Sequence, residues 1–307
     1  GKTQGVFQLE SAGITGVCVN MRPTSIEDMT AIVALYRPGP MGNIPSYIER
    51  KHGREQPDYL LPMLEGILKE TYGIMIYQEQ VMQISRDMAG FSLGGADLLR
   101  RIMGKKKAEL LPPERVKFID GAKAKGVSQE VAEKVFDKMA KFASYGFNKA
   151  HAAAYAFIAY QTAYLKAHFP AEFMAATMTL DKINTDKLAI FKEDVLAHKI
   201  EVLPPDINLS EVNFTVQDGK VRYALSAVKN VGEAGMMAVV AEREKNGPFK
   251  SIQDFASRVD VSALNKRYVE NLAKSGAFEC IEKNRAMVFN NVENIVSYAA
   301  QATQGRN

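Results

Sequence analysis

The chain has 307 residues, of which 47% are apolar and 24% are charged, and its formal net charge is +4. This length and this apolar fraction are enough for one large or two ordinary domains with a real core. Cys18 and Cys280 form no Cys-x-x-Cys pair, which argues against a disulfide framework and a zinc site. No apolar run approaches the ~20 residues of a membrane span, so we expect a globular protein of the reducing cytoplasm. The chain begins with Gly1 rather than Met, and we expect a piece of a larger protein.

The first two thirds of the sequence predict a helical domain. Ser25 can cap a helix that stops at the rigid turn formed by residues 37–40, because proline disfavours helix at the residue before it. Apolar residues then recur at helical spacing in several further segments. These predicted helices are residues 73–88, 96–103, 113–124, 129–142, the alanine-rich 148–169, and 171–178.

The pattern changes after the extended segment at residues 203–206. Asp218 and Gly219 lie between two short β-prone runs and predict a hairpin, because both residues tolerate positive φ. Short helices with tight turns follow, at residues 235–245, 252–258, 263–274 and 286–300. We therefore predict a mainly α chain with one domain over residues 1–180, a connecting helix and linker over 181–212, and a β-hairpin with short helices over 213–307.

A dense cluster of positive charge follows the glycine pair at residues 94–95. Within eight positions the cluster holds Arg100, Arg101, Lys105, Lys106 and Lys107. The arginines close a helix whose apolar face must be packed, whereas three consecutive lysines cannot all be buried. Such a cluster is typical of a phosphate-binding site for a polyanion, and the alternative is a solvated basic loop.

The start of the alanine-rich helix predicts a second anion site. Its first turn is expected to offer free N–H groups and the positive end of the helix dipole, with Lys149, His151 and Tyr155 nearby. His151 and Tyr155 are four residues apart and therefore share one face, where a tyrosine ring could stack on a base or a sugar. The alternative is an ordinary capped helix with a partly buried histidine.

Residues 227–234 have the shape of a helix-hairpin-helix turn. Such a turn lets backbone N–H groups approach a DNA phosphate without side chains in the way. Asn230 stands where the first glycine usually lies, and asparagine is the best substitute at a left-handed position. We expect Lys229 to lie beside the phosphate, and Gly232 to adopt a left-handed backbone that permits close approach.

The sequence offers no catalytic residues of a familiar type. A metal-dependent polymerase or nuclease needs carboxylates that converge on two metal ions, and the chain contains no Asp-x-Asp. A P-loop, a Gly-x-Ser-x-Gly elbow and a His-Glu-x-x-His motif are also missing. We therefore predict no catalytic residue and no metal ligand in this chain.

Several further segments occur in an order that resembles bacterial replicative DNA polymerase III alpha subunits, the C family of DNA polymerases. These segments are residues 5–11, Tyr36-Arg37-Pro38-Gly39-Pro40-Met41, Tyr77-Gln78-Glu79-Gln80-Val81-Met82, residues 99–107, Phe147-Asn148-Lys149-Ala150-His151, residues 164–170 and Leu264-Asn265-Lys266-Arg267. The resemblance runs from Gly5 to about Phe278. It implies most of the helical fingers region of such a polymerase, together with a small β-hairpin and a helix-hairpin-helix subdomain.

The resemblance also implies roles for the residues singled out above. The fingers would bind the triphosphate of the incoming deoxynucleotide through Arg100, Arg101, Lys105, Lys106 and Lys107, and the nucleotide pocket would be lined by Lys149, His151 and Tyr155. Arg37 and Gly39 would shape the wall nearest the template. The remaining DNA contacts would come from Lys229, Asn230, Gly232, Lys266 and Arg267.

The family's catalytic aspartates belong to a palm domain that precedes this segment, so the resemblance implies that this chain alone is inactive. Magnesium would be held by that palm in the parent enzyme. The implied partners are primer-template DNA, deoxynucleoside triphosphates, and a replicase with a sliding clamp, a clamp loader and a proofreading exonuclease. The competing hypothesis is a non-catalytic helix-hairpin-helix module for DNA binding or repair, which would bind duplex DNA without responding to deoxynucleotides.

Overall fold

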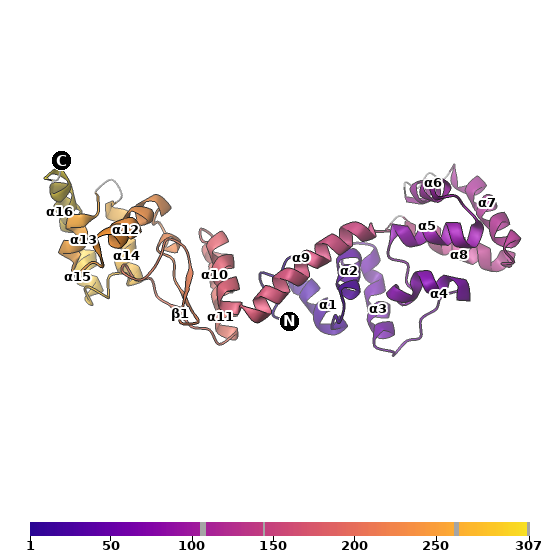
Figure 1. The fold of residues 1–307 in the computed structure, drawn as a ribbon, viewed down its shortest axis with the longest axis horizontal. Coiled ribbons are helices and arrows are strands. Elements are labelled where there is room, and N and C mark those ends of the chain that lie inside the picture. The colour runs from indigo at the N-terminus through magenta and orange to yellow at the C-terminus, as the bar shows by residue number, and fades with distance from the viewer. Residues whose placement is uncertain (105–108, 144, 261–263, 306–307) are drawn as a thin grey trace. The chain divides into compact units, whose positions relative to one another are not determined.

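The computed structural model describes residues 1–104, 109–143, 145–260 and 264–305. The chain forms two compact units, Gly1–Ala163 and Tyr164–Asn307. The described residues are mainly helical, and a small sheet follows the helical part, which confirms the predicted fold class (Figure 1). The functional division predicted from the sequence, with limits at residues 180 and 212, stays a prediction. No helix in the described ranges is long and apolar enough to cross a membrane.

The first unit contains two hydrophobic cores. The first core is enclosed by α1 (Ala12–Met21), α2 (Ile26–Leu35), the 3-10 turn η1 (Pro40–Asn43), α3 (Ile44–Lys51) and the first turns of α9 (Lys149–His168). Ser25 caps α2 as predicted, because its side chain accepts the N–H of Asp28. Ala152 and Ala159 of α9 are fully buried in this core, so their small side chains let this long helix pack closely against it.

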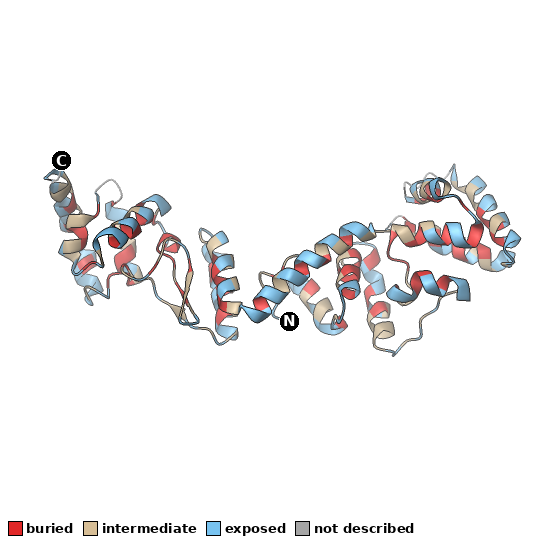
Figure 2. Cartoon of the chain, viewed as in Figure 1, coloured by how far each residue is buried: buried red, intermediate tan, exposed pale blue. Residues whose placement is uncertain are grey.

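The second core of this unit holds the elements that carry the basic cluster. It is enclosed by α4 (Pro62–Leu68), the 3-10 turn η2 (Lys69–Thr71), α5 (Gln78–Ala89), α6 (Leu93–Gly104), α7 (Leu111–Ala124) and α8 (Gln129–Ala143). Leu99, Ile102 and Met103 are buried, which confirms the packed face of α6 at these three positions. The same face was expected to include Leu98, and this is wrong, because Leu98 is 53% exposed. Figure 2 shows the same division into buried and exposed faces along these helices.

A short backbone pairing lies at the first core, where the chain enters and leaves the second. Tyr77 and Phe147 form a parallel β-bridge, in which Gln78 N donates to the Phe147 carbonyl at 2.9 Å and Phe147 N donates to the Ile76 carbonyl at 3.1 Å. The helix predicted from residue 73 is therefore wrong at its start, and α5 begins at Gln78. The reason is that the N–H groups of Ile76 and Tyr77 both donate to the side chain of Gln80, which holds them out of the helix.

The second unit begins with a sheet that packs on two helices. The helices are α10 (Pro170–Leu180) and α11 (Thr185–Ala197), and the strands are β1 (Val202–Leu203), β2 (Thr215–Gln217) and β3 (Lys220–Arg222). The strand order is β1-β3-β2, with β1 parallel and β2 antiparallel to β3. Asp218 and Gly219 have φ of 50° and 73°, which confirms the predicted hairpin turn.

Short helices form the rest of the second unit around a separate core. They are the 3-10 turn η3 (Leu225–Ala227), α12 (Glu233–Asn246), α13 (Ile252–Arg258), α14 (Lys266–Ser275), α15 (Arg285–Asn290) and α16 (Val292–Gln304). The single helix predicted at 286–300 is wrong, because Asn291 leaves helical geometry at φ −107° and ψ 14° and separates α15 from α16. The helix predicted from residue 263 begins at Lys266, because the side chain of Asn265 accepts the N–H of Tyr268 and caps it.

Candidate nucleotide and nucleic-acid interface

The two arginines at the end of α6 share one carboxylate. Arg100 Nη2 lies 2.5 Å from Asp97 Oδ1, and Arg101 Nη2 lies 2.8 Å from Asp97 Oδ2. The hydrogen bond from Arg100 holds the pKa of Asp97 below its usual range, so this carboxylate stays ionised. Two guanidinium groups against one carboxylate leave an excess positive charge at the surface, with N–H donors to spare for an anion. The predicted Lys105, Lys106 and Lys107 lie outside the described residues.

Residues 145–148 form the loop that precedes α9. Hydrogen bonds of Gln78 link this loop to Arg100 of the basic cluster. Gln78 Nε2 donates to the Gly146 carbonyl at 3.0 Å, while Gln78 Oε1 accepts from Arg100 Nη1 at 3.2 Å. On the other side, Arg37 donates to the Tyr145 carbonyl and its guanidinium lies 4.5 Å from the centre of the Phe147 ring. One glutamine thus ties Arg100 to the loop, and Arg37 holds the loop from the opposite direction.

At the first turn of α9, side chains of the chain itself already accept backbone hydrogen bonds. Glu79 accepts from Asn148 Nδ2 and from Lys149 N, both at 3.0 Å, and Asn148 Oδ1 accepts from His151 N at 2.7 Å. Two N–H groups expected to be free at this helix end, those of Lys149 and His151, are therefore bonded. The partner of Lys149 N is a carboxylate of the chain itself, which lies at the positive end of the dipole. Lys149 Nζ contacts Glu70 at 2.6 Å, so its ammonium group is paired as well.

A row of aromatic rings extends along α9 from this loop. The ring centres of Phe147 and His151 are 5.5 Å apart, and those of His151 and Tyr155 are 4.3 Å apart. The predicted common face of His151 and Tyr155 is therefore confirmed. The row continues to Phe7, whose ring centre lies 5.3 Å from that of Tyr155. The rings are tilted against one another by 42–50°, and His151 is exposed, so its ring face is open to a base or a sugar.

Gly39 completes this surface because it leaves room for Tyr145. Its φ is 101°, and a Cβ added at this position would lie 2.4 Å from the Tyr145 ring. The structure therefore brings six predicted residues of the first unit to one loop and its immediate neighbours. They are Arg37, Gly39, Arg100, Lys149, His151 and Tyr155.

The turn at residues 228–232 of the second unit has the geometry expected of its asparagine. Asn230 has φ of 65°, which confirms it at the left-handed position. Its side-chain oxygen accepts from Arg267 Nη2, and Lys229, Asn230 and Arg267 are all exposed. Lys266 also points to solvent but contacts Glu293 at 2.6 Å. The turn and the start of α14 therefore form one exposed surface that carries three cations.

The expectation of a left-handed Gly232 is wrong. Gly232 has φ −83° and ψ 143°, an extended conformation that any residue adopts. The glycine is required for space instead, because a Cβ at residue 232 would lie 2.0 Å from Tyr268 Oη. The Tyr268 side chain of α14 thus packs directly against the backbone of Gly232, at the start of α12.

Several residues of these surfaces were missed by sequence reasoning. Gln78 and Glu79 lie inside one of the segments that carry the family resemblance, and that was the available signal. Asp97 lies three and four residues before the two arginines, a spacing that predicts helix-surface ion pairs. Lys182 gave no signal: its Nζ lies 2.9 Å from Glu233 Oε1 and 2.7 Å from Asn213 Oδ1, and these partners are distant in sequence.

The fold and these surfaces define a class of protein in which a helical domain is followed in the same chain by a turn of the helix-hairpin-helix kind. Residues 1–126 match the family described as the bacterial DNA polymerase III alpha subunit finger domain. Residues 199–288 match the helix-hairpin-helix motif.

Similar proteins cover almost the entire chain. DNA polymerase III subunit alpha of Caulobacter vibrioides is 52% identical over 299 residues, which are 97% of this chain and 26% of that protein. The proteins of the same name from Neisseria meningitidis and Thermus aquaticus are 51% and 48% identical over 99% of this chain, and 27% and 25% of their lengths are covered. The chain belongs to the family of bacterial DNA polymerase III alpha subunits. It spans about a quarter of the length of these relatives.

Proposed function

We propose that this chain is the fingers part of a bacterial replicative DNA polymerase and that its first unit binds the triphosphate of the incoming deoxynucleotide. The observation that carries the proposal is the connection from Arg100 through Gln78 to the loop at residues 145–148, which joins the basic end of α6 to the aromatic row of α9. Phosphoryl transfer is accelerated mainly by positioning and by neutralising charge on the phosphates, and arginines beside stacking rings supply both.

Each predicted residue has a role in this proposal. Arg100, Arg101 and the sequence-predicted Lys105, Lys106 and Lys107 receive the phosphates, because a polyphosphate needs several cations at once. His151 and Tyr155 support the sugar and base, while Lys149 provides charge once the phosphates compete with Glu70 for it. Arg37 and Gly39 hold the loop and form the wall nearest the template.

The second unit holds duplex DNA in the same proposal. The N–H groups of the turn and the side chains of Lys229 and Arg267 contact the phosphate backbone, and Lys266 adds affinity from α14. Backbone contacts of this kind position a duplex without reading its sequence. A replicative polymerase needs such contacts because it must copy every sequence.

The bond-forming chemistry is assigned to another part of the polymerase. Among the residues that the structure describes, no group of three or more His, Cys, Asp or Glu side chains could hold a metal ion. Magnesium is therefore proposed to bind in the palm domain, where it would stabilise the attacking and leaving oxygens, and this chain alone is proposed to be inactive in primer extension. Cytoplasmic location and assembly with a sliding clamp, a clamp loader and a proofreading exonuclease belong to the same proposal.

The test is the affinity for an incoming deoxynucleotide, measured by single-turnover incorporation in a full-length alpha subunit that carries these residues. Arg100→Gln should weaken the apparent affinity at least tenfold, because a hydrogen bond to a charged group is worth about 1.5–3 kcal/mol. Arg115→Gln is the matched control, because Arg115 also pairs with carboxylates but lies on α7, with its nitrogens near Glu133 and Asp137. Equal affinities for the two variants would contradict the proposed nucleotide site. Duplex binding by this chain that does not respond to deoxynucleotides would support the non-catalytic DNA-binding module instead.

A further inference from the structure

Two apolar side chains extend into solvent where α10 ends and the chain turns into α11. Leu180 and Ile183, the apolar patch of the second unit, are 86% and 89% exposed. These exposures are the highest among the large apolar residues that the structure describes. Single exposed apolar residues are ordinary on protein surfaces, whereas apolar residues that gather at one place point to an interaction site.

Polar contacts hold this turn between the helices in one conformation. Asn184 N donates to the Asp181 carbonyl at 2.8 Å, and the side chain of Asn184 caps the start of α11. The backbone before the turn is held as well, because Thr179 Oγ1 accepts from Phe214 N at 3.2 Å. The exposure of the apolar patch is therefore a property of the folded chain, which holds both side chains away from the core.

Lys182 ties the apolar patch to the helix-hairpin-helix turn. Its Nζ lies 2.9 Å from Glu233 Oε1 and 2.7 Å from Asn213 Oδ1. Glu233 directly follows Gly232, the last residue of the turn, and begins α12. The apolar patch and the turn therefore belong to neighbouring parts of one surface, on which Lys229 is also exposed.

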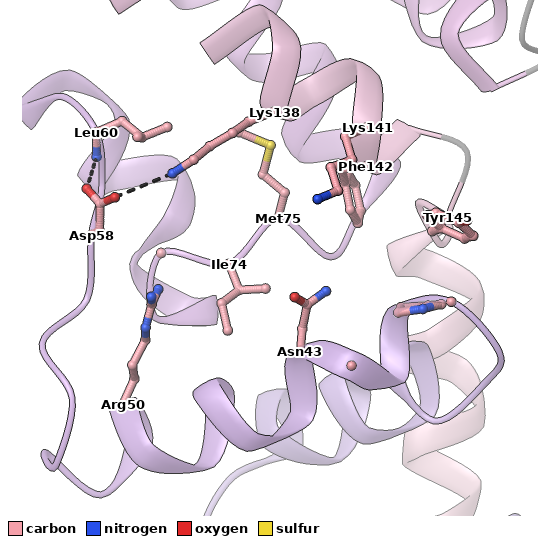
Figure 3. A pocket seen from close by; sticks show the side chains of 14 residues that line it. Asn43, Arg50, Asp58, Leu60, Ile74, Met75, Lys138, Lys141, Phe142 and Tyr145 are labelled. Atoms are coloured by element: carbon pink, nitrogen blue, oxygen red, sulfur yellow. Dashed lines mark hydrogen bonds and ion pairs between the residues drawn. The ribbon is translucent and has the colours of Figure 1, made fainter. Parts of the chain in front are cut away.

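The cleft beside Tyr145 in the first unit shows how the apolar patch differs from a charged site (Figure 3). Lys138 Nζ of that cleft lies 3.4 Å from Asp58 Oδ2. Arg50 Nη2 lies 2.7 Å from Glu55 Oε1, so both cations already have partners. The apolar patch has no charge to satisfy, and it gains from a partner only by removing apolar surface from water. Its partner must therefore offer hydrocarbon surface, while the neighbouring turn needs phosphates.

We propose that Leu180 and Ile183 enter the minor groove of the duplex whose phosphate backbone the helix-hairpin-helix turn holds. The inference rests on the proposed function, since it needs a duplex at the turn. Such a duplex offers both partners at once, phosphates for the turn and the C–H faces of deoxyribose rings for the apolar patch. Leucine and isoleucine are among the side chains that proteins insert into the minor groove. This groove also suits a polymerase that copies every sequence, because its pattern of donors and acceptors is degenerate, whereas the major groove distinguishes every base pair.

The binding test uses a blunt duplex and a full-length alpha subunit that carries these residues. Leu180→Ser with Ile183→Ser should weaken duplex binding about tenfold, because the apolar contact is lost. The log-log salt slope should stay unchanged, since an apolar contact releases no counterions, whereas Lys229→Ala should make the slope shallower. Ile190→Ser with Leu196→Ser is the matched control, because these side chains are 48% and 52% exposed but lie further along α11. Equal losses for the two double variants, or no loss, would overturn the proposal.

Hydroxyl-radical footprinting locates the contact on the DNA, because these radicals cleave at deoxyribose hydrogens that line the minor groove. The unchanged subunit should protect sugars of both strands across one minor groove, next to the phosphates held by the turn. The Leu180→Ser, Ile183→Ser variant should lose this protection even at saturating concentration, while its melting temperature stays unchanged. Retained protection would overturn the proposal. Loss of self-association with unchanged duplex binding would also overturn it, because the patch would then bind a second copy of the chain.

The two salt slopes separate this inference from the proposed function. An unchanged affinity and slope for Lys229→Ala, with the effects of the apolar patch intact, would remove the proposed phosphate contact of the turn alone. The expected result for Lys229→Ala without any effect at Leu180 and Ile183 would remove the minor-groove contact alone.

Discussion

Tyr268 Oη occupies the space that a side chain at Gly232 would need, because a Cβ added there would lie 2.0 Å from this oxygen and 2.8 Å from Cζ. Tyr268 of α14 thus packs against the helix-hairpin-helix turn. Arg267 of the same helix donates a hydrogen bond to the side-chain oxygen of Asn230. The position of the turn depends on this contact and not on an unusual backbone at residue 232.

The first prediction follows from this contact. Gly232→Ala should destabilise the chain by about 1–3 kcal/mol, because overpacking forces Tyr268 or the turn to move. Thermal melting should show this loss, and duplex affinity should fall with it. Adding Tyr268→Phe should recover only part of the stability, since the oxygen is removed but Cζ remains. Gly66→Ala is the control, because an added Cβ there has no neighbour within 4 Å. Equal melting temperatures for the two alanine variants would disprove the steric account.

The second prediction concerns Lys229, which is exposed beside Asn230. Lys229→Ala should weaken duplex binding equally for unrelated sequences, because a phosphate contact carries no base information. The log-log salt slope should become shallower by roughly 0.9, the contribution of one phosphate contact to B-form DNA. Titrations at several salt concentrations measure both effects. Lys245→Ala, at the far end of α12, should change neither, and a sequence-dependent loss at Lys229 would contradict the proposed role.

The third prediction concerns Lys182, which is only 14% exposed and pairs with Glu233 in the first turn of α12. Glu233 would repel a phosphate bound at the turn if this lysine did not neutralise it. Lys182→Ala should therefore weaken duplex binding about twofold to fivefold, the effect of roughly 0.3–1 kcal/mol for a charge near a helix N-terminus.

A second substitution, Glu233→Gln, distinguishes neutralisation of Glu233 by Lys182 from a direct phosphate contact of Lys182. Combined with Lys182→Ala, it should restore duplex affinity to the level of the unchanged chain, because no uncompensated acid remains. Lys187→Ala serves as the control, since Lys187 pairs with Asp181 nearby at 2.8 Å. A double variant that binds as poorly as Lys182→Ala alone would assign Lys182 a direct phosphate contact or a structural role.

The fourth prediction is an acid-sensitive ion pair in the first unit. Asp28 is 3% exposed and lies 2.8 Å from Lys51 Nζ. Burial opposes its ionisation, but hydrogen bonds from Lys51 and Thr24 outweigh this effect and lower its pKa. A group with a lowered folded pKa stabilises the fold fully above its unfolded pKa, near 3.9, and loses this contribution as the pH falls through the folded value.

Asp28→Asn tests this prediction in the neutral range and in acid. At pH 7 the variant should lose about 3 kcal/mol of unfolding free energy, because Lys51 is left buried without a counter-ion. Below pH 4 the difference from the unchanged chain should shrink as Asp28 becomes protonated. Denaturant titrations between pH 3 and pH 7 measure the difference in unfolding free energy between the variant and the unchanged chain. A constant difference over this range would contradict the proposed ion pair of Asp28 and Lys51.

Local sequence determined most helices, the proline-rich turn after Tyr36 and the hairpin turn at Asp218-Gly219. Ser25, the proline-rich stop after Tyr36 and the Asp218-Gly219 hairpin act over a few residues, so their effects are visible without tertiary structure. Residues 12–21, 44–51 and 62–68 were not predicted as helices although they form α1, α3 and α4. These helices have ten residues or fewer, and short helices depend on tertiary packing more than on their own periodicity.

The composition of the candidate site was also visible in the sequence, but its connections were not. The basic cluster is a dense run of cations in the sequence itself. The shared face of His151 and Tyr155 follows from their spacing along a helix. Tertiary structure alone decided that Gln78 joins Arg100 to Gly146, that Glu79 fills the start of α9, and that Tyr268 reserves the space at Gly232. Each of these partners is separated by tens of residues, so the contact exists only after the hydrophobic cores have fixed the helices that carry it.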